Sequence, residues 1–450
     1  MFLPVSQRDM AQSITRRDAL CEGGLGIEIS DKDAIMELTE RPLVLPCKRS
    51  FAERSDVMLY REDRSGQQIS QLGYGCMRFT RKGASIDFEK AEREVLRAVE
   101  GGVNYLDTAY IYPGSEECVG KIVEKNHLRS RVKIATKLPQ YLMRTPAAID
   151  RVFQEELRRL RTDYIDYYLM HMFTDVQEWE NIRALGIEDW IARHKADGSI
   201  RNIGFSYHGD TEMFLKLLDA YDWDFCQIQY NYLDEHSQAG RRGLEAAAAK
   251  GIPVIIMEPL RGGKLVNQLP KEAKACMAGS GRGYTAAEWG LRWLWDQPGV
   301  TCVLSGMNSM EQVEENLRIA SSAAVGDFTE ADRAVIGEVR RAIRAHEKVG
   351  CTGCRYCMPC PKGVDIPGLF YHYNLMGIES KLSARMEFFK TMAVKVEPGF
   401  ASRCVGCGKC EQHCPQHIPI REKIWEADQN LRPFPFKAVM GIARKVMIHK

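Results

Sequence analysis

The sequence predicts an α/β fold: a TIM (β/α)8 barrel that begins with a β-hairpin and is followed by a small, cysteine-rich C-terminal domain. Strand-like and helix-like segments alternate eight times over roughly 250 residues, which is the size and order of such a barrel. Eight of the 15 cysteines lie within residues 351–414 of the 450-residue chain. A doubly wound open sheet is the alternative architecture, but no G-x-G-x-x-G sequence opens a helix here.

The expected elements follow one another closely. The hairpin is expected at 57–60 and 67–70, with a turn at 63–66. Barrel strands are expected at 71–75, 103–106, 132–136, 165–170, 202–205, 225–228, 253–257 and 301–304. Helical periodicity is expected between them, for example at 87–100, 117–125, 146–160, 210–220, 237–250, 285–295 and 310–320, and a further charged helix is expected within 329–347.

Composition excludes some classes of partner and location. Lys and Arg number 62 and Asp and Glu 60, so nucleic acid is not an expected partner, because phosphate binding needs a basic excess. No run of ~18 apolar residues occurs, so no membrane span is expected. The cysteine pattern is typical of a reducing compartment and predicts a cytoplasmic protein. Thr15-Arg16-Arg17 resembles the start of a twin-arginine signal, but acidic residues follow where the apolar stretch should be, and export is not expected.

Four polar residues close the second, third and fourth expected strands. Asp107 and Tyr112 follow the second strand, Lys137 the third and His171 the fourth. Catalytic residues of a TIM barrel lie at the C-terminal ends of its strands, so these side chains are expected at one mouth. A Lys ammonium lowers the pKa of a nearby Tyr hydroxyl, and a buried Asp keeps the Lys charged. Such a set is suited to protonating an oxygen while hydride reaches a carbonyl carbon.

These residues also carry a resemblance to a known family. Asp107-Thr-Ala-x-x-Tyr112, Lys137 and Leu169-Met-His171 resemble the catalytic tetrad motifs of the aldo-keto reductases, and the order matches over about residues 57–320. The resemblance implies NADP or NAD lying extended across the barrel mouth. It implies the following cofactor-binding residues: Gly75, Met77, Asp107, Ser206, Tyr207, Gln227, Met257, Pro259, Leu260, Arg261, Gly306, Asn308, Gln312, Glu315 and Asn316.

Three departures from the family pattern bear on the cofactor. Met257 stands where the family has a Tyr stacked on the nicotinamide, and Tyr207 stands where it has an Asn. Gly306, Met307 and Gln312 occupy positions where NADPH-specific members carry Lys, Ser or Arg. A 2′-phosphate requires a positive partner, so weak discrimination between NADPH and NADH is expected, with Arg261 as a candidate compensating charge.

The cysteine segment predicts two [4Fe-4S] clusters. Its second run has the C-x2-C-x2-C-x3-C-P spacing of bacterial ferredoxins, in which the fourth Cys of each run ligates the other cluster. One cluster is therefore expected on Cys351, Cys354, Cys357 and Cys414, and the other on Cys404, Cys407, Cys410 and Cys360. Zinc is the weaker alternative. Cys360-Pro-Lys-Gly-Val-Asp-Ile-Pro367 also resembles the ferredoxin-like tail of a subgroup of aldo-keto reductases.

The expected organisation is a poorly ordered leader (1–54), the barrel (55–325), a connecting helix (326–349), a ferredoxin-like domain (350–425) and a tail (426–450). The expected function is an oxidoreductase that interconverts a small carbonyl compound and its alcohol by hydride transfer. The alternatives are an iron-sulfur electron-transfer protein, which would exchange electrons with a separate redox protein, and a nucleotide-sensing module. The intact tetrad favours the enzyme.

Overall fold

A computed structural model describes residues 57–447, apart from 352, 354, 356, 396 and 415. The leader expected at 1–54 lies outside the described residues. All described residues belong to one compact unit, Ala52–Lys450.

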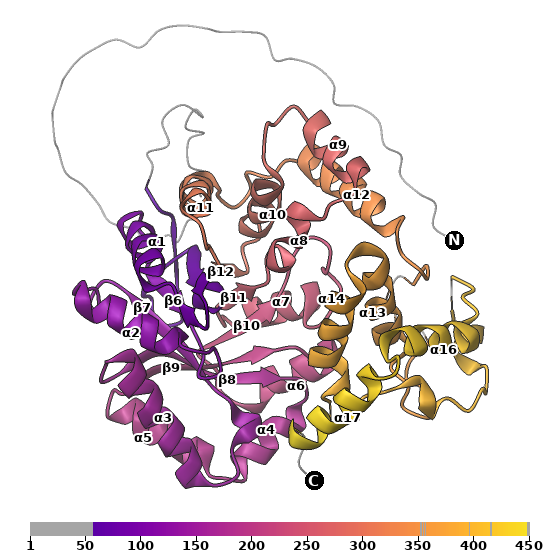
Figure 1. Ribbon diagram of the computed structural model, residues 1–450, viewed down its shortest axis with the longest axis horizontal. Coiled ribbons are helices and arrows are strands. Elements are labelled where there is room, and N and C mark those ends of the chain that lie inside the picture. The colour runs from indigo at the N-terminus through magenta and orange to yellow at the C-terminus, as the bar shows by residue number, and fades with distance from the viewer. Residues whose placement is uncertain are drawn as a thin grey trace, which may run out of the picture. The chain divides into compact units, whose positions relative to one another are not determined.

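Eight parallel strands close into a barrel in the order β10-β11-β12-β3-β6-β7-β8-β9 (Figure 1). The strands are β3 (Leu72–Gly75), β6 (Tyr105–Asp107), β7 (Lys133–Leu138), β8 (Ile165–Phe173), β9 (Ile200–Tyr207), β10 (Phe225–Gln229), β11 (Val254–Met257) and β12 (Val300–Ser305). Each overlaps the strand expected from the sequence, so the TIM barrel is confirmed and the open-sheet alternative is wrong.

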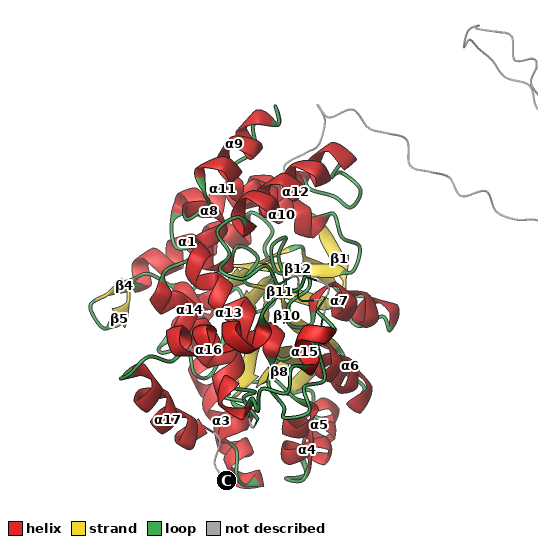
Figure 2. Ribbon diagram, turned by 90° about the vertical axis from the view of Figure 1, so that its right-hand side faces the viewer, coloured by secondary structure: helices red, strands yellow, loops and turns green. Residues whose placement is uncertain are grey.

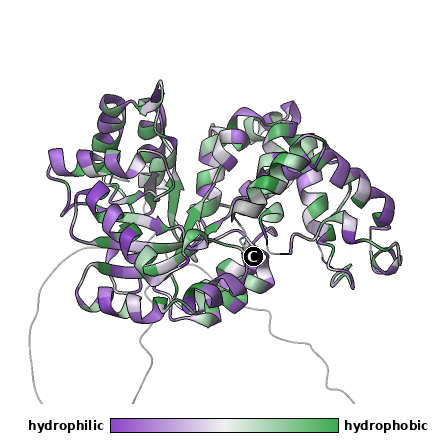
Figure 3. Ribbon diagram, turned by 60° about the horizontal axis from the view of Figure 1, so that its bottom comes forward, coloured by the Kyte–Doolittle hydropathy of each residue, from purple (hydrophilic) through white to green (hydrophobic). Residues whose placement is uncertain are grey.

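Helices surround the strands, as Figure 2 shows. They are α1 (Phe88–Glu100), α2 (Ser115–Lys125), α3 (Pro146–Leu160), α4 (Val176–Arg183), α5 (Ile187–Ala196), α6 (Thr211–Ala220), α7 (Gly240–Ala249), α8 (Lys264–Asn267), α9 (Lys271–Gly279), α10 (Ala286–Trp295), α11 (Met310–Ser322) and α12 (Glu330–Arg344). Several begin at a capping side chain: Asp87 accepts from the backbone N–H of Lys90, and Thr145 from that of Ala148. Apolar and polar residues alternate around the helices in Figure 3, as expected where one face packs on the barrel.

A hairpin covers the N-terminal end of the barrel. Strands β1 (Tyr60–Glu62) and β2 (Gln68–Ser70) pair antiparallel, and Ile69 is fully buried among the side chains that fill the barrel. The guanidinium of Arg61 donates to the carbonyls of Trp295 and Gln297 just before β12. A second small hairpin, β4 (Arg81–Lys82) and β5 (Ser85–Ile86), follows β3. The opposite end, where the strands finish, is the end at which TIM barrels carry their active sites.

The cysteine-rich module has a hydrophobic core of its own. Its elements are α13 (Ile366–Ile378), α14 (Lys381–Phe388), a π-helical turn (Phe389–Ala393), α15 (Lys409–Gln412), α16 (Ile420–Leu431) and α17 (Phe436–Met447). Partly buried cysteines pack against that core. The boundary expected at residue 425 falls inside α16, and Met440 of α17 is buried in the same core, so the module continues beyond 425. Within the described residues, no helix has the length and apolar character needed to cross a membrane.

Candidate functional site

The ends of neighbouring strands bring Asp107 and Lys137 together. The ammonium of Lys137 lies 2.8 Å from each carboxylate oxygen of Asp107 and 2.6 Å from the carbonyl oxygen of Thr108. These three acceptors match the three protons of an ammonium group. Lys137 is 1% exposed, so its charge is held in one place by a buried partner.

Tyr112 lies beside this ion pair in the loop before α2. The Lys137 nitrogen is 5.3 Å from the centre of the Tyr112 ring, and the His171 ring centre is 6.0 Å away. Burial raises the pKa of the Tyr112 hydroxyl, and the negative charges of Asp107 and Glu258 raise it further. The net shift of the Tyr112 pKa is therefore upward, with burial as the largest cause, and the lowering expected from Lys137 stays a prediction. The phenol stays protonated.

His171 is buried and neutral. Burial lowers the pKa of its imidazole well below the usual range, and the charges of Lys137 and His208 act in the same direction. Its Nδ1 atom has no hydrogen-bond partner among the described residues. A neutral imidazole carries one N–H, so His171 can donate one hydrogen bond to a bound oxygen without carrying a positive charge.

A cavity of about 650 Å³ opens at this end of the barrel. Thirteen of the cofactor-binding residues expected from the sequence line it: Gly75, Met77, Asp107, Ser206, Gln227, Met257, Pro259, Leu260, Gly306, Asn308, Gln312, Glu315 and Asn316. Tyr112 and His171 line it too, whereas Lys137 lies behind Asp107. The Gln227 side-chain amide donates to Asp107 over 2.9 Å, which ties β10 to the catalytic group.

The structure does not bring Tyr207 and Arg261 to this cavity. Ser206 and Tyr207 are consecutive on β9 and point to opposite faces of the sheet, so only one of them can face the barrel mouth. The Tyr207 hydroxyl donates to the Asp210 carbonyl over 2.6 Å, and its ring packs on Phe214 outside the barrel. Arg261 is buried, with its Nε 3.1 Å from an Asp234 carboxylate oxygen. Both assignments are corrected: neither side chain lines the cavity.

Arg78 lines the end of the cavity formed by the loops after β11 and β12, and it was missed in the sequence. It lies against one glycine of each of these loops. A Cβ atom on Gly262 would be 2.5 Å from Arg78 Nη2, and one on Gly306 would be 3.1 Å from Arg78 Cδ. The signal that could have found it is its position directly after β3, since residues that close a barrel strand face the mouth.

The cysteine-rich module also contributes to the cavity wall. Glu387 of α14 and Lys390 of the π-helical turn line it together with Glu258 and His208. Burial raises the pKa of Glu387 to about 7, and the charge of Glu258 adds to that rise. No local sequence pattern predicts that these residues meet, because Glu387 follows Glu258 by more than 100 positions.

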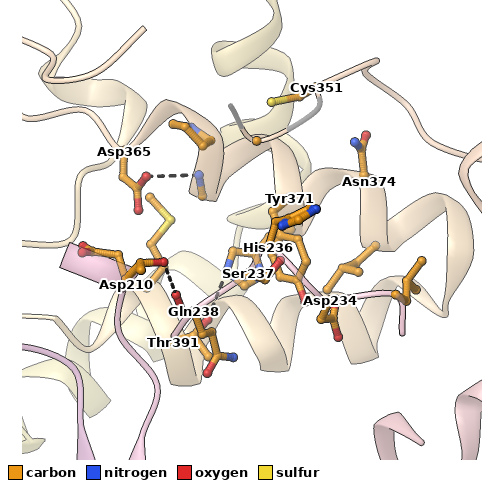
Figure 4. A pocket seen from close by; sticks show the side chains of 18 of the residues that line it. Asp210, Asp234, His236, Ser237, Gln238, Cys351, Asp365, Tyr371, Asn374 and Thr391 are labelled. Carbon is orange, nitrogen blue, oxygen red and sulfur yellow. Dashed lines mark hydrogen bonds between the residues drawn. The ribbon is translucent and has the colours of Figure 1, made fainter. Parts of the chain in front are cut away.

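A second pocket, of about 170 Å³, lies between barrel loops and the module (Figure 4). Asp210, Asp234 and Gln238 come from the barrel, and Cys351 and Tyr371 come from the module. His208 lines both this pocket and the large cavity. The predicted cluster ligand Cys351 therefore lies at a pocket that shares a wall with the barrel mouth.

The other expected ligands line two cavities within the module. A cavity of about 330 Å³ is lined by Cys357, Cys360, Cys404, Cys407 and Cys410, which include one complete predicted set. A narrower one, of about 20 Å³, is lined by Cys351, Cys357 and Cys414 of the other set, whose fourth member, Cys354, lies outside the described residues. Among the described residues, no three of these thiols are close enough to share a single metal ion. Thiol-lined, otherwise largely apolar cavities fit iron-sulfur clusters.

Comparison with known proteins agrees with the fold. The model of the aldo/keto reductase family matches residues 71–333, more than half of the chain, and that of a 4Fe-4S dicluster domain matches residues 350–418. An aldo-keto reductase of Mycobacterium sp. (strain JLS) is 30% identical over 290 residues, which cover 62% of this chain and 92% of that protein. The chain belongs to the aldo/keto reductase family of oxidoreductases and carries a C-terminal 4Fe-4S domain.

Two solved structures illustrate the likeness. The holo form of an aldo-keto reductase from Bacillus halodurans superposes with a TM-score of 0.53 at 25% identity, covering 63% of this chain and 96% of that one. An aldo-keto reductase from Klebsiella pneumoniae in complex with NADPH gives a TM-score of 0.51 at 26% identity, covering 62% and 96% of the two chains.

Proposed function

We propose that this protein interconverts a small carbonyl compound and its alcohol with NADPH or NADH, and that its module holds two [4Fe-4S] clusters. The observation that carries the proposal is the convergence of Asp107, Tyr112, Lys137 and His171 beside one large cavity. That cavity has a volume of about 650 Å³ and extends to Gly306 and Asn316 after β12. The NADPH complex of the Klebsiella relative supports this cofactor class.

Each catalytic side chain has a distinct role in the proposed reaction. A bound nicotinamide supplies the hydride to the carbonyl carbon. Tyr112 gives its phenolic proton to the carbonyl oxygen, and the transfer is favourable because an alkoxide is a stronger base than a phenolate. His171 donates a hydrogen bond to the same oxygen, while Asp107 keeps Lys137 charged and in place beside the ring of Tyr112.

The residues proposed to hold the nucleotide line the cavity from end to end. Ser206 and Gln227 would hold the carboxamide of a bound nicotinamide, and Met257 would contact its ring. Pro259, Leu260 and the neighbouring glycines would hold the pyrophosphate, with Arg78 as the cation at that end. Gly75 and Met77 border the mouth, and Gly306, Asn308, Gln312, Glu315 and Asn316 hold the adenosine end.

The ligands proposed for the two clusters are those expected from the spacing. Cys351, Cys354, Cys357 and Cys414 hold one cluster, and Cys360, Cys404, Cys407 and Cys410 hold the other. Each cluster exchanges one electron at a time when bound.

Anaerobic oxidation of NADPH and NADH with a panel of aldehydes and ketones tests the enzymatic proposal. Tyr112→Phe removes only the proton donor, so we expect a loss of about 10²-fold or more in carbonyl reduction with nucleotide binding unchanged. Tyr110→Phe is the matched control, because Tyr110 is outside the lining of the cavity. A Tyr112→Phe enzyme that kept more than a tenth of the wild-type rate would show that Tyr112 is not the acid.

An electron-transfer role is the second candidate, and the exposure of Cys407 favours it. A cluster ligated there would lie near the surface, within reach of a partner redox protein. Turnover of carbonyl compounds that persists without any partner protein would favour the enzyme. The absence of turnover, together with reduction of the clusters by an added ferredoxin or flavodoxin, would favour electron transfer.

A further inference from the structure

The loop after β11 forms the floor of the nucleotide end of the cavity. Pro259, Leu260, Gly262 and Gly263 line it. Gly262 and Gly263 have φ of 66° and 89°, so the loop adopts a left-handed conformation that favours glycine. A loop built on glycines has no bulky side chains to fix its shape, so it must be held from outside.

Arg261 is the side chain through which this loop is held. It is 4% exposed and turns away from the cavity. Its Nε lies 3.1 Å from Asp234, its Nη2 donates to the Tyr371 hydroxyl over 3.1 Å, and its Nη1 is 3.3 Å from Glu379. Three partners thus surround one guanidinium, and two of them belong to the cysteine-rich module.

Two further contacts complete this network. The Tyr371 hydroxyl donates to Asp234 over 3.0 Å, so it accepts from Arg261 and donates to the partner of Arg261. The ammonium of Lys264, directly after the loop, is 2.5 Å from Glu379. The buried cation Arg261 and the partly exposed cation Lys264 therefore face two buried carboxylates, and removing a partner of Arg261 leaves a buried charge without compensation.

Helix α13 connects this network to the clusters. Its residues Ile366, Pro367 and Phe370 line the narrower cluster cavity together with Cys351 and Cys414. Tyr371 is the residue after Phe370, and Glu379 caps the C-terminal end of the helix. Figure 4 shows Tyr371 and Asp234 on the same pocket as Cys351. If α13 shifted when a cluster was lost, Tyr371 would move with it, because Tyr371 lies within one helical turn of the residues that line the cluster cavity.

We propose that Tyr371 and Glu379 are positioning residues that hold the nucleotide loop through Arg261 and Lys264, so that nucleotide affinity depends on assembled clusters. This inference rests on the proposed nucleotide binding. We call these contacts of Tyr371 and Glu379 with Arg261 and Lys264 the clamp. The clamp acts on the nucleotide loop whether or not the clusters transfer electrons. Because coupling between two binding free energies is reciprocal, bound nucleotide must also raise the affinity of the module for its iron.

Tyr371→Phe and Tyr373→Phe form a matched pair of variants on one helix. The Tyr373 hydroxyl bonds to Glu426 within the module and leaves the loop untouched. In the anaerobic, cluster-loaded protein, we expect Tyr371→Phe to weaken NADPH binding about tenfold, since it removes a hydrogen bond to a charged group. Iron content and the rate constant at saturating NADPH stay at wild-type values. Tyr373→Phe binds NADPH as the wild type does.

Cluster removal supplies the second measurement. Oxidative removal of iron from the wild type should weaken NADPH binding, and the same treatment should weaken it less in Tyr371→Phe, whose clamp is already loosened. At equilibrium with an iron chelator, saturating NADPH should increase the iron retained by the wild type more than that retained by Tyr371→Phe. Glu379→Gln repeats the Tyr371→Phe pattern through the other contact.

The outcomes separate this inference from the proposed function. A wild type that binds neither NADPH nor NADH would overturn the proposed function and the clamp with it. A wild type that binds nucleotide equally well with and without clusters, or a Tyr371→Phe variant with unchanged affinity, would overturn the clamp alone.

Discussion

At the scale of single residues, Arg78 is the cation in the best position for the cofactor phosphates. It occupies the space that a Cβ atom on Gly262 or Gly306 would need, between the loop expected at the pyrophosphate and the end expected at the adenosine ribose. The sequence instead suggested Arg261, whose guanidinium is committed to Asp234, Tyr371 and Glu379. The expected weak preference between NADPH and NADH therefore depends on Arg78.

Replacing Arg78 tests this role. We expect Arg78→Ala to weaken NADPH binding about 10- to 100-fold, the range of a charge-assisted hydrogen bond, and NADH binding by less. Arg81→Ala is the control, because Arg81 is outside the lining of the cavity and donates to the carbonyls of Ala84 in its own hairpin and of Pro113 in the loop before α2. Titration of both nucleotides by fluorescence measures the effect. Equal losses would place the guanidinium at the pyrophosphate, and unchanged affinity would contradict the assignment.

The meeting of the residues proposed as catalytic could be predicted from the sequence because three of them lie near the C-terminal ends of neighbouring strands. Asp107, Lys137 and His171 need only the order of the strands and the rule that strand ends share one mouth. The prediction that Tyr207 and Arg261 line the cofactor cavity was wrong for a different reason. A strand reverses the direction of its side chains at every residue, so Tyr207 points away from the mouth that Ser206 faces. Arg261 pairs with Asp234 and with Glu379, and Glu379 lies more than 100 positions further along the chain.

At the scale of elements, the barrel strands were predictable and the docking of the module was not. Buried parallel strands are short apolar runs bounded by turns, so each leaves a local signal. The approach of α14 to the barrel mouth depends on contacts between residues more than 100 positions apart, for which one sequence carries no periodic signal. That approach brings Glu387 and Lys390 into the wall of the catalytic cavity.

Glu387 makes the stability of this contact depend on pH. Burial first, and then the charge of Glu258, raise its pKa to about 7 from an ordinary value near 4.5. The folded state therefore holds a proton that the unfolded chain releases, so stability is present below about pH 4.5 and falls as the pH rises to about 7.

Glu387→Gln should remove the pH dependence of stability that arises from the Glu387 carboxyl. Between pH 5 and 8 we expect the wild type to lose up to about 3 kcal/mol more free energy of unfolding than the variant. Denaturant unfolding of the anaerobic protein at both pH values measures the difference. Glu422→Gln, at a mostly exposed side chain, is the control and should follow the wild type. A Glu387→Gln profile that coincided with that of the wild type would contradict the assignment.

At the scale of the whole molecule, the iron content tests the two-cluster assignment. We expect about eight irons per chain after anaerobic purification, and about four in Cys404→Ser, with lower stability because ligation contributes folding free energy. Cys276→Ser, on α9 of the barrel, should keep the full iron content. Iron and zinc analysis alongside thermal unfolding distinguishes these results. Zinc in place of iron in protein kept anaerobic would contradict the assignment.

Two kinds of electron chemistry lie close together in this molecule. His208 lines the catalytic cavity and also the pocket that reaches Cys351, so the proposed hydride site and one proposed cluster are separated by a shared wall. Nearness alone does not couple them. A nicotinamide gives up two electrons as one hydride, whereas each cluster accepts one electron, and coupling the two normally requires a flavin or another two-to-one converter.

We therefore expect NADPH alone to leave the clusters oxidised on the time scale of turnover. Anaerobic mixing with NADPH in a stopped-flow instrument, without a carbonyl substrate, should leave the cluster absorbance unchanged over many turnover times. Dithionite should bleach the same sample, which shows that the clusters can accept electrons. In that case the module affects catalysis through the residues it presents, Glu387 and Lys390 at the cavity and Tyr371 at the nucleotide loop. Bleaching by NADPH at the turnover rate, in protein shown to be free of flavin, would instead mean that hydride chemistry and the clusters share electrons directly across the wall that His208 forms.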